Sequence, residues 1–211
     1  MKIAFLGIGN VGAPLAGNLA KAGHELTVAA RDPQSQSVQK ALAAYPGLAV
    51  LPAREALSKA DVVFLATPFA ANETALKGIE SDLKGKVLVD CTNPVGAGIS
   101  HGLDNKMSGA ESVQALAPGA HVVKAFSIYG YENFIDSRYP AAKEPPAMLI
   151  AGDDAAAKET VAKICADLGW KALDVGPLSS SLHLEHMALL WIKMARLQGK
   201  GPGFVWAVLE R

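Results

Sequence analysis

The sequence predicts an α/β fold in which a doubly wound, mainly parallel sheet is followed by a small helical C-terminal elaboration. Two observations lead to this prediction. Short apolar segments alternate with segments of helical periodicity along most of the 211 residues, as expected where helices join parallel strands. An apolar run at residues 3–6 also leads directly into Gly7, Gly9 and Gly12. This G-x-G-x-x-G spacing between a strand and a helix is typical of the Rossmann fold.

The periodicity predicts each element in turn. The helix after the glycines is expected at residues 10–22, since Val11, Leu15 and Leu19 form one stripe and Gly23 follows it. Further helices are expected before residue 49, at 53–58, after the capping-box pair Ser108 and Glu111, and at 153–168. The further strands are expected at 26–30, 49–51, 62–66, 87–90, 122–126, 147–151 and 171–175.

A long helix is expected at residues 178–197. Its apolar side chains lie on nearly all sides, which indicates burial. Glu185 in this helix needs a partner if it is buried, and a backbone amide and Lys124 are the candidates. Trp191 is expected in the core. Together with residues 204–209, the helix offers more apolar surface than one small domain needs to cover, and this surplus predicts a homodimer.

The composition argues against nucleic-acid and membrane partners. Twenty Lys and Arg balance twenty Asp and Glu, so no surface of one charge is expected. Half of the residues are hydrophobic and the mean hydropathy is +0.20, as suits a sheet covered on both faces. No segment reaches the ~20 apolar residues of a membrane span, and no signal peptide is recognised. Cys91 and Cys165 stand far apart and indicate buried side chains in a reducing cytoplasm.

The glycine-rich segment predicts the phosphate-binding turn of a dinucleotide site. Gly7 permits the tight turn, Gly9 lets the backbone approach a pyrophosphate, and Gly12 lets the helix pack closely on the strand. Loops that follow the carboxyl ends of the strands should complete the site, because ligands of open α/β sheets bind there. The predicted cofactor-binding residues are Gly7, Ile8, Gly9, Asn10, Val11, Gly12, Ala30, Arg31, Asp32, Ser35, Ala66, Thr67, Pro68, Phe69, Asn93, Pro94 and Ala125.

The end of the second strand indicates NADP(H) rather than NAD(H). NAD-binding domains usually place an Asp or Glu there for the ribose hydroxyl, whereas an Arg nearby accommodates the 2′-phosphate of NADP. Here Ala30 stands at the expected acidic position, and Arg31 supplies a guanidinium. Asp32 comes one residue later and belongs to a turn with Pro33. The alternative interpretation makes Arg31 a solvated loop charge.

Several later segments then resemble one family of oxidoreductases. These segments are Ala30-Arg31-Asp32, Ala66-Thr67-Pro68, Ser108-Gly109-Ala110-Glu111, Val122-Val123-Lys124-Ala125-Phe126, Asp174-Val175-Gly176-Pro177-Leu178, Leu184-Glu185 and Leu190-Trp191-Ile192. Together with the glycines, they resemble the coenzyme F420-dependent NADP reductases across the whole chain. The cytosolic domains of six-transmembrane metalloreductases look related. The resemblance implies NADP(H) as cofactor and direct hydride transfer to a deazaflavin (F420) or flavin-like acceptor. It implies no catalytic acid or base.

On this basis, residues 1–145 are expected to form the NADP(H)-binding Rossmann domain. Residues 146–211 should complete the sheet, the acceptor pocket and the dimer contact. The sequence departs from the family pattern near that pocket, at Ser127-Ile128-Tyr129 and at Ser179-Ser180-Ser181 with His183, and Ser35 replaces a second basic residue. Tyr129 and Tyr131 are expected at the acceptor pocket or at a dimer contact.

Other functions remain alternatives. Thr67 and Asn93 are expected to bond a ribose or a carboxamide, and an ordinary turn role is the other interpretation; Phe69 either flanks a ring or packs in the interior. His183 and His186 share a helix face but lack a third metal ligand, so no metal is predicted. The altered acceptor segment leaves open a NADP(H)-binding sensor without turnover. Further alternatives are a reductase of a quinone, a metal chelate or another small substrate, and a plain NAD-dependent dehydrogenase in which Arg31 does not contribute to affinity.

Overall fold

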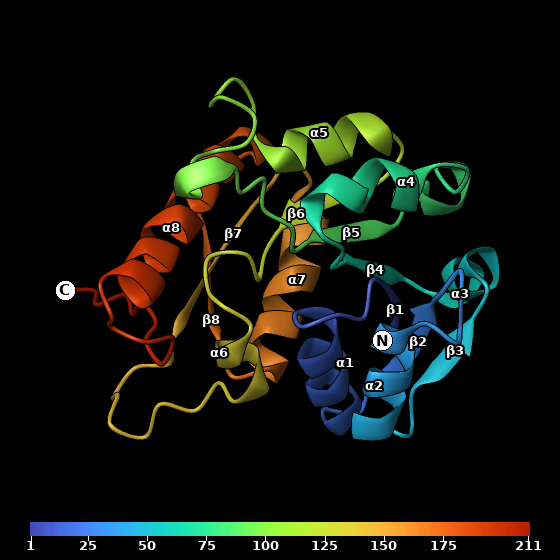
Figure 1. Cartoon of the computed structure of the whole chain (residues 1–211), viewed down its shortest axis with the longest axis horizontal. Coiled ribbons are helices and arrows are strands. Elements are labelled where there is room, and N and C mark those ends of the chain that lie inside the picture. The colour runs from blue at the N-terminus through green and yellow to red at the C-terminus, as the bar shows by residue number, and fades with distance from the viewer.

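The computed structural model describes all 211 residues and contains one eight-stranded sheet with helices on both faces (Figure 1). The strand order is β3-β2-β1-β4-β5-β6-β7-β8, and β1 lies beside both β2 and β4, where the chain changes direction across the sheet. The strands are β1 (Lys2–Leu6), β2 (Glu25–Ala29), β3 (Ala49–Leu51), β4 (Val62–Leu65), β5 (Val87–Asp90), β6 (His121–Lys124), β7 (Ala147–Gly152) and β8 (Lys171–Asp174). The predicted fold class is confirmed.

Alternate residues of the strands feed two separate hydrophobic cores, as the period of two in a strand requires. Ile3 and Phe5 of β1 belong to the larger core, whereas Ala4 and Leu6 belong to the smaller one. The larger core packs against α1 (Gly12–Lys21), α2 (Gln36–Ala44), α6 (Glu132–Ile135), α7 (Ala155–Asp167) and α8 (Ser181–Ile192). The smaller core packs against α3 (Ala53–Lys59), α4 (Asn72–Leu76) and α5 (Gly109–Leu116).

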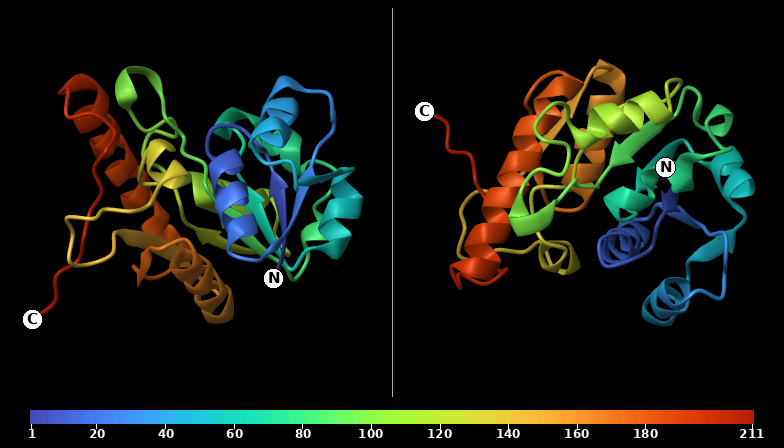
Figure 2. Two further views of the ribbon diagram at one scale, coloured as in Figure 1. Left: turned by 90° about the horizontal axis from the view of Figure 1, so that it is seen from below. Right: turned by 45° about the horizontal axis from the view of Figure 1, so that its top comes forward.

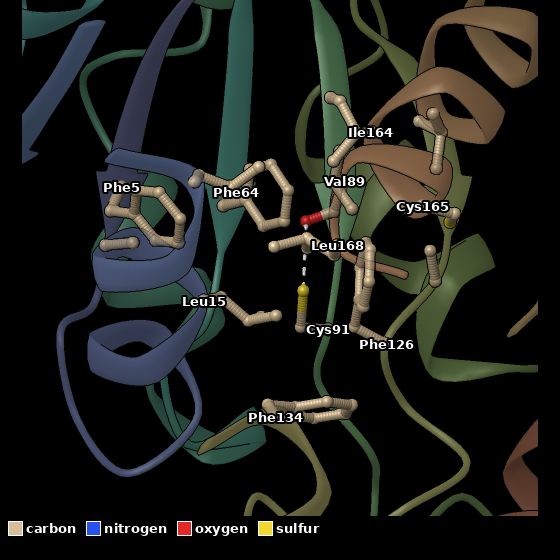
Figure 3. Packing of buried hydrophobic residues seen from close by; sticks show 14 of the residues in the cluster. Phe5, Leu15, Phe64, Val89, Cys91, Phe126, Phe134, Ile164, Cys165 and Leu168 are labelled. Carbon is tan, nitrogen blue, oxygen red and sulfur yellow. Dashed lines mark hydrogen bonds between the residues drawn. The ribbon is translucent and has the colours of Figure 1, made fainter. Parts of the chain in front are cut away.

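The larger core crosses the centre of the sheet. Phe5 and Phe64 stack at 4.7 Å between ring centroids, and Phe126 and Phe134 continue the aromatic cluster (Figure 3). Cys91 and Cys165 lie within this cluster as free, buried thiols. Because burial disfavours the thiolate, it raises the pKa of both cysteines. Both side chains are therefore the buried hydrophobes that their isolation in the sequence predicts.

The structure differs from the predicted elements in four respects. Strand β7 runs antiparallel to β6, with Val123 opposite Gly152, whereas all other strand pairs are parallel. Helices α4 and α6 were not predicted, because five and four residues are too few to show a helical period. Helix α1 begins at Gly12 rather than at residue 10. The expected long helix is a 3-10 turn (Leu178–Ser180), then α8, then a π-helical turn (Lys193–Leu197).

The C-terminal segment packs along α8 before its last residues extend away from the body (Figure 2). The Trp191 indole Nε1 donates to the carbonyl of Phe204 at 3.0 Å, and its ring stacks on that of Phe204. The amide of Ala147 in β7 donates to the carbonyl of Trp206 at 2.9 Å. Trp191 is 1% exposed, so its predicted place in the core is confirmed. None of the helices combines the length and apolar character that crossing a membrane requires.

Candidate functional site

The glycine-rich loop between β1 and α1 leaves no room for side chains at two of its three glycines. Gly7 adopts a φ of +93°, and a Cβ there would lie 2.7 Å from the carbonyl carbon of Ala66. A Cβ on Gly12 would lie 2.3 Å from the carbonyl oxygen of Gly7. No side chain caps the N-terminus of α1, so its first N–H groups stay available to an anion. Gly9 is exposed with open space around it.

Arg31 at the end of β2 separates two cavities at the carboxyl edge of the sheet. A cavity of 210 Å³ lies between Arg31 and α4 and has an apolar lining that includes Ala29, Ala71 and Ala75. A second cavity of 280 Å³ lies on the other side of Arg31. The guanidinium donates from Nη2 to the carbonyl oxygen of Thr74 in α4, which holds the side chain across the edge. Arg31 is exposed, but its guanidinium is held in place by a neighbouring element.

The second cavity contains the other residues predicted at this strand end. Its lining includes Ala30, Asp32, Ser35 and Ile8. The Asp32 carboxylate accepts the amide of Gln34 at 2.9 Å, as an Asx turn requires. Asp32 is thus engaged by its own turn, in agreement with the interpretation from the sequence. Arg31 is the charged group that remains available to a ligand here.

A third cavity, of 270 Å³, lies beyond the glycine-rich loop on the side of α1 and α2. It is lined by Gly9, Asn10 and Pro14, and Tyr131 contributes from the segment after β6. Tyr129, by contrast, is buried, and its hydroxyl donates to the carbonyl of Ala147 at 2.7 Å. Burial raises the pKa of Tyr129. Tyr131 therefore lines this cavity, whereas Tyr129 belongs to the larger hydrophobic core.

The loop after β4 borders the glycine-rich loop, and the loops after β5 and β6 are joined to each other. Backbone atoms of Ala66 and Thr67 lie within 2.8 Å of the position that a Cβ on Gly7 would take. Asn93 donates from Nδ2 to the carbonyl of Ser127 at 2.7 Å and thereby joins the ends of β5 and β6. Its Oδ1 and the Ser127 hydroxyl are buried without a hydrogen-bond partner. Two unpaired polar atoms therefore lie in the loops that follow β5 and β6, where a ligand can satisfy them.

The end of β6 contains a strained residue. Ala125 continues the ladder by donating its amide to the carbonyl of Asp90, but Phe126 then adopts a φ of +53°. The left-handed region is unfavourable for a bulky side chain, and such strain concentrates at functional sites. The Phe126 amide points to the Met148 sulfur at 3.2 Å. The Phe126 ring packs against the rings of Phe64 and Phe134 in the aromatic cluster, which holds the residue in this conformation (Figure 3).

Phe69 and Pro94 pack against the start of α5. A Cβ on Gly109 would lie 2.8 Å from the Phe69 ring and 3.0 Å from Pro94 Cδ. Of the two roles considered for Phe69, this contact supports packing. Pro68 precedes the short 3-10 turn Phe69–Ala71 and is exposed. Ser108 and Glu111 form the predicted capping box at the N-terminus of α5.

A buried ion cluster of Asp90, Lys124, Glu185 and His101 lies behind these loops. The Lys124 ammonium is 3.0 Å from Asp90 Oδ2 and 3.0 Å from Glu185 Oε1, and it also donates to the carbonyl of Thr92. Burial acts to lower the pKa of Lys124, but the two carboxylates outweigh it and raise the pKa. Burial acts to raise the pKa of Glu185, but Lys124, His101 and the Gly109 amide lower it.

Glu185 joins α8 to the N-terminus of α5. Its carboxylate accepts the amides of Gly109 at 3.0 Å and Ala110 at 3.3 Å, and it contacts His101 Nε2 at 2.8 Å. Both partners predicted for Glu185, a backbone amide and Lys124, are confirmed. Sequence analysis missed Asp90 and His101, which lie 95 and 84 residues from Glu185. His186 stacks on His101, His183 is exposed, and no group of three or more side chains could hold a metal ion.

The site and the fold therefore define a Rossmann-type α/β protein with a glycine-rich loop of the dinucleotide-binding kind. Comparison with known proteins identifies its family. Residues 2–94 match the family model described as NADP oxidoreductase coenzyme F420-dependent. The F420-dependent NADP reductase of Methanothermobacter marburgensis is 30% identical over 209 residues, which cover 92% of each chain. The protein belongs to the family of F420-dependent NADP reductases.

Two further relatives support this assignment. A solved structure of a candidate F420-dependent NADP reductase from Arthrobacter sp. FB24 is 30% identical, with a TM-score of 0.86 and 96% of each chain covered. Metalloreductase STEAP3 of Rattus norvegicus is 31% identical over 189 residues, or 89% of this chain. The chain spans 36% of the length of that metalloreductase. Its similarity therefore concerns one part of the larger protein.

Gly12→Ala is expected to impair both folding and nucleotide binding. The added methyl group would meet the Gly7 carbonyl oxygen, so the loop has to move away from α1. We expect a loss of about 1–3 kcal/mol in the free energy of unfolding, the usual cost of overpacking. We expect NADPH to bind at least ~10-fold more weakly, as a loss of one charge-assisted hydrogen bond would cause. Chemical denaturation and titration calorimetry measure the two effects.

Gly47→Ala is the matched control, because a Cβ at Gly47 meets nothing within 4 Å. It should leave NADPH affinity unchanged. Unaltered affinity in Gly12→Ala would contradict the close packing of loop and helix.

Proposed function

We propose that this protein transfers hydride between NADP(H) and a flavin-like or deazaflavin acceptor such as coenzyme F420. The observation that carries the nucleotide half of this proposal is Arg31, which follows the acid-free end of β2 and stands between two cavities. The acceptor half rests on the family. The three relatives named above include an F420-dependent NADP reductase that this chain covers almost completely.

The residues present fit NADP(H). Gly7 and Gly12 let the loop pack closely on its neighbours, Gly9 faces open space, and the uncapped start of α1 suits a pyrophosphate. The apolar cavity beside α4 suits the flat adenine ring, and the cavity on the other side of Arg31 suits the 2′-phosphate. Ser35 would provide a hydroxyl donor for that phosphate. The cofactor-binding residues predicted from the sequence are retained as this proposed site.

The loops after β5 and β6 would receive the nicotinamide half. Asn93 Oδ1 is an unpaired acceptor and the Ser127 hydroxyl an unpaired donor, which matches the amino and carbonyl groups of a carboxamide. When bound, NADPH supplies a hydride from C4 of its nicotinamide ring. The protein's contribution is to hold two rings in contact and to exclude water, so no side chain is assigned as acid or base. Ala125, Pro94 and the strained Phe126 would shape the face of this pocket.

The C-terminal part would complete the acceptor pocket and the assembly. We retain the division into residues 1–145 and 146–211, which falls just before the strand that reverses direction, β7. Leu190 and Leu197 are 51% and 70% exposed on α8 and the π-helical turn after it. We propose a homodimer in which a second copy of the chain covers these side chains. The exposed apolar residues support this proposal. A cytoplasmic location also stays a prediction.

An acceptor screen tests the proposal. The absorbance of reduced nicotinamide is followed with NADPH and, in turn, F420, free flavins, quinones and ferric chelates. We expect oxidation of NADPH with the deazaflavin or a flavin, and no comparable rate with NADH. Turnover only with quinones or metal chelates would assign a different substrate to the same nucleotide site. Tight NADPH binding without turnover by any acceptor would support a NADP(H) sensor and refute the proposed reaction.

A further inference from the structure

We infer that the Thr67 hydroxyl presents only its lone pairs to the nucleotide, because a chain of buried hydrogen bonds fixes its proton away from the cleft. Thr92 and Asn72 are then positioning residues that act through Thr67. The group of the nucleotide that meets Thr67 must be a hydrogen-bond donor of the adenosine half, either the ribose hydroxyl or the adenine amino group. This inference rests on the proposed NADP(H) site.

The chain of hydrogen bonds starts at the buried ion cluster. An ammonium group has three hydrogens, and Lys124 directs them to Asp90 Oδ2, to Glu185 Oε1 and to the carbonyl of Thr92. Lys124 and Asp90 are fully buried, so neither is satisfied by water. Both carboxylate oxygens of Asp90 act as acceptors, because Oδ2 faces the Lys124 ammonium at 3.0 Å and Oδ1 faces the Thr92 amide at 2.9 Å. The direction of every bond to Asp90 is therefore known.

The bonds to Asp90 determine the orientation of the Thr92 hydroxyl. Its amide and its hydroxyl both donate to Asp90 Oδ1, at 2.9 Å and 2.7 Å. The single hydroxyl hydrogen of Thr92 is thereby used, so its oxygen can only accept from other groups. The group beside it is Asn72, 2.9 Å away and 3% exposed, which must turn its amino group toward Thr92.

Asn72 then fixes Thr67. With its amino group on Thr92, the Asn72 carbonyl oxygen faces Thr67 Oγ1 at 2.7 Å. Two oxygens at this distance need one hydrogen between them, and only the threonine hydroxyl has it. The opposite orientation of Asn72 would place its carbonyl against the Thr92 oxygen, whose hydrogen belongs to Asp90. Thr67 therefore donates inward to Asn72.

One cavity then has a hydrogen-bond donor at Arg31 and a hydrogen-bond acceptor at Thr67. Thr67 and Arg31 both line the 210 Å³ cavity beside α4. Arg31 has only donors to offer and attracts a phosphate oxygen, whereas Thr67 offers only lone pairs and repels one. A nucleotide is therefore favoured in one orientation, with an anionic group at Arg31 and a hydroxyl or amino group at Thr67. The second anchor of the ion cluster, Glu185 on α8, connects this selection to the C-terminal part.

A double-mutant cycle on NADPH affinity tests the inference. Thr67→Val removes the acceptor and is expected to weaken NADPH about threefold to tenfold. Thr92→Val interrupts the chain, frees Asn72 and Thr67 to reorient, and should weaken NADPH about threefold. Because Thr92 acts through Thr67, the double variant should bind NADPH like Thr67→Val alone. Thr92→Ser keeps the hydroxyl and should restore the original affinity.

Thr160→Val is the control. The Thr160 hydroxyl donates to the carbonyl of Ala156 within α7, and Thr160 lines neither cavity beside Arg31. Two NADPH analogues distinguish the sources of the donor: one carries hypoxanthine in place of adenine, the other lacks the 3′-hydroxyl of the adenosine ribose. The analogue without the relevant donor should lose affinity and show no further loss in Thr67→Val.

Three outcomes would overturn the inference. Effects of Thr67→Val and Thr92→Val that add in the double variant would show that Thr92 acts by a route other than Thr67. Unchanged affinity in Thr67→Val would remove its acceptor role. Equal losses for both analogues and NADPH in Thr67→Val would show that no adenosine donor meets it. Failure of the unaltered protein to bind NADPH would instead contradict the proposed function, so the two failures are distinguishable.

Discussion

Lys124→Met is expected to lower the free energy of unfolding by about 3–5 kcal/mol, the usual cost of removing one partner from a buried ion pair. Lys124 is fully buried and compensates two carboxylates, those of Asp90 and Glu185. Methionine fills a similar volume but leaves both charges without a cation and the Thr92 carbonyl without a donor. Urea denaturation followed by circular dichroism measures the loss.

The control for this prediction is Lys163→Met. Lys163 forms an exposed pair with Glu159 one turn away on α7, with both side chains about two-thirds exposed. Exposed pairs contribute little, so a change below about 1 kcal/mol is expected. Glu185→Gln retains the shape of its site and should destabilise the protein less than Lys124→Met does, since one carboxylate still pairs with Lys124. Equal effects of the two lysine substitutions would refute the role of the ion cluster in stability.

Arg31→Ala is expected to weaken NADPH binding by ~1.5–3 kcal/mol, the range of a hydrogen bond to a charged group, and to leave NADH binding nearly unchanged. The guanidinium is the only charged donor among the residues that line both cavities at the end of β2. NADH lacks the phosphate that this guanidinium would bind. The residue is exposed, so the substitution should not alter the fold.

Arg54→Ala provides the comparison, because Arg54 is an exposed arginine on the neighbouring helix α3 that bonds the carbonyl of Gly78 and lines neither cavity. Its removal should change neither affinity. An equal loss for NADPH and NADH in Arg31→Ala would indicate a general effect on the loop and would contradict recognition of the 2′-phosphate.

Local chemistry explains which parts of the fold could be predicted from the sequence. The glycines of the loop and Arg31 lie within 25 residues of one another, and their roles depend on backbone space and charge at their own positions. Strands buried on both faces are short apolar runs, so their positions were also predictable. The direction of β7 was not predictable, because the apolar pattern of a buried strand is the same whether its neighbour runs parallel or antiparallel. The reversal is seen in the register of the structure, where Val123 pairs with Gly152 and Lys124 with Ala151.

The buried ion cluster could not be predicted from the sequence as a whole. Asp90 and Lys124 come from adjacent strands, His101 from a loop and Glu185 from the last long helix. Sequence spacing cannot show that four such residues meet. One signal was available: a glutamate on an apolar helix needs a partner, and this requirement did point to Lys124. No comparable signal marks Asn72, whose role depends on the orientation of its amide between two threonines.

The central claim is that Arg31 at the end of β2 makes the protein select NADP(H), which carries a 2′-phosphate, over NAD(H). Titration of the unaltered protein and of Arg31→Ala with NADPH and NADH, side by side in one calorimetric experiment, tests it most directly. We predict that the unaltered protein binds NADPH at least ~10-fold more tightly than NADH, and that Arg31→Ala removes most of this difference. Equal affinity of the unaltered protein for the two nucleotides, or a preference that survives in Arg31→Ala, would contradict the claim.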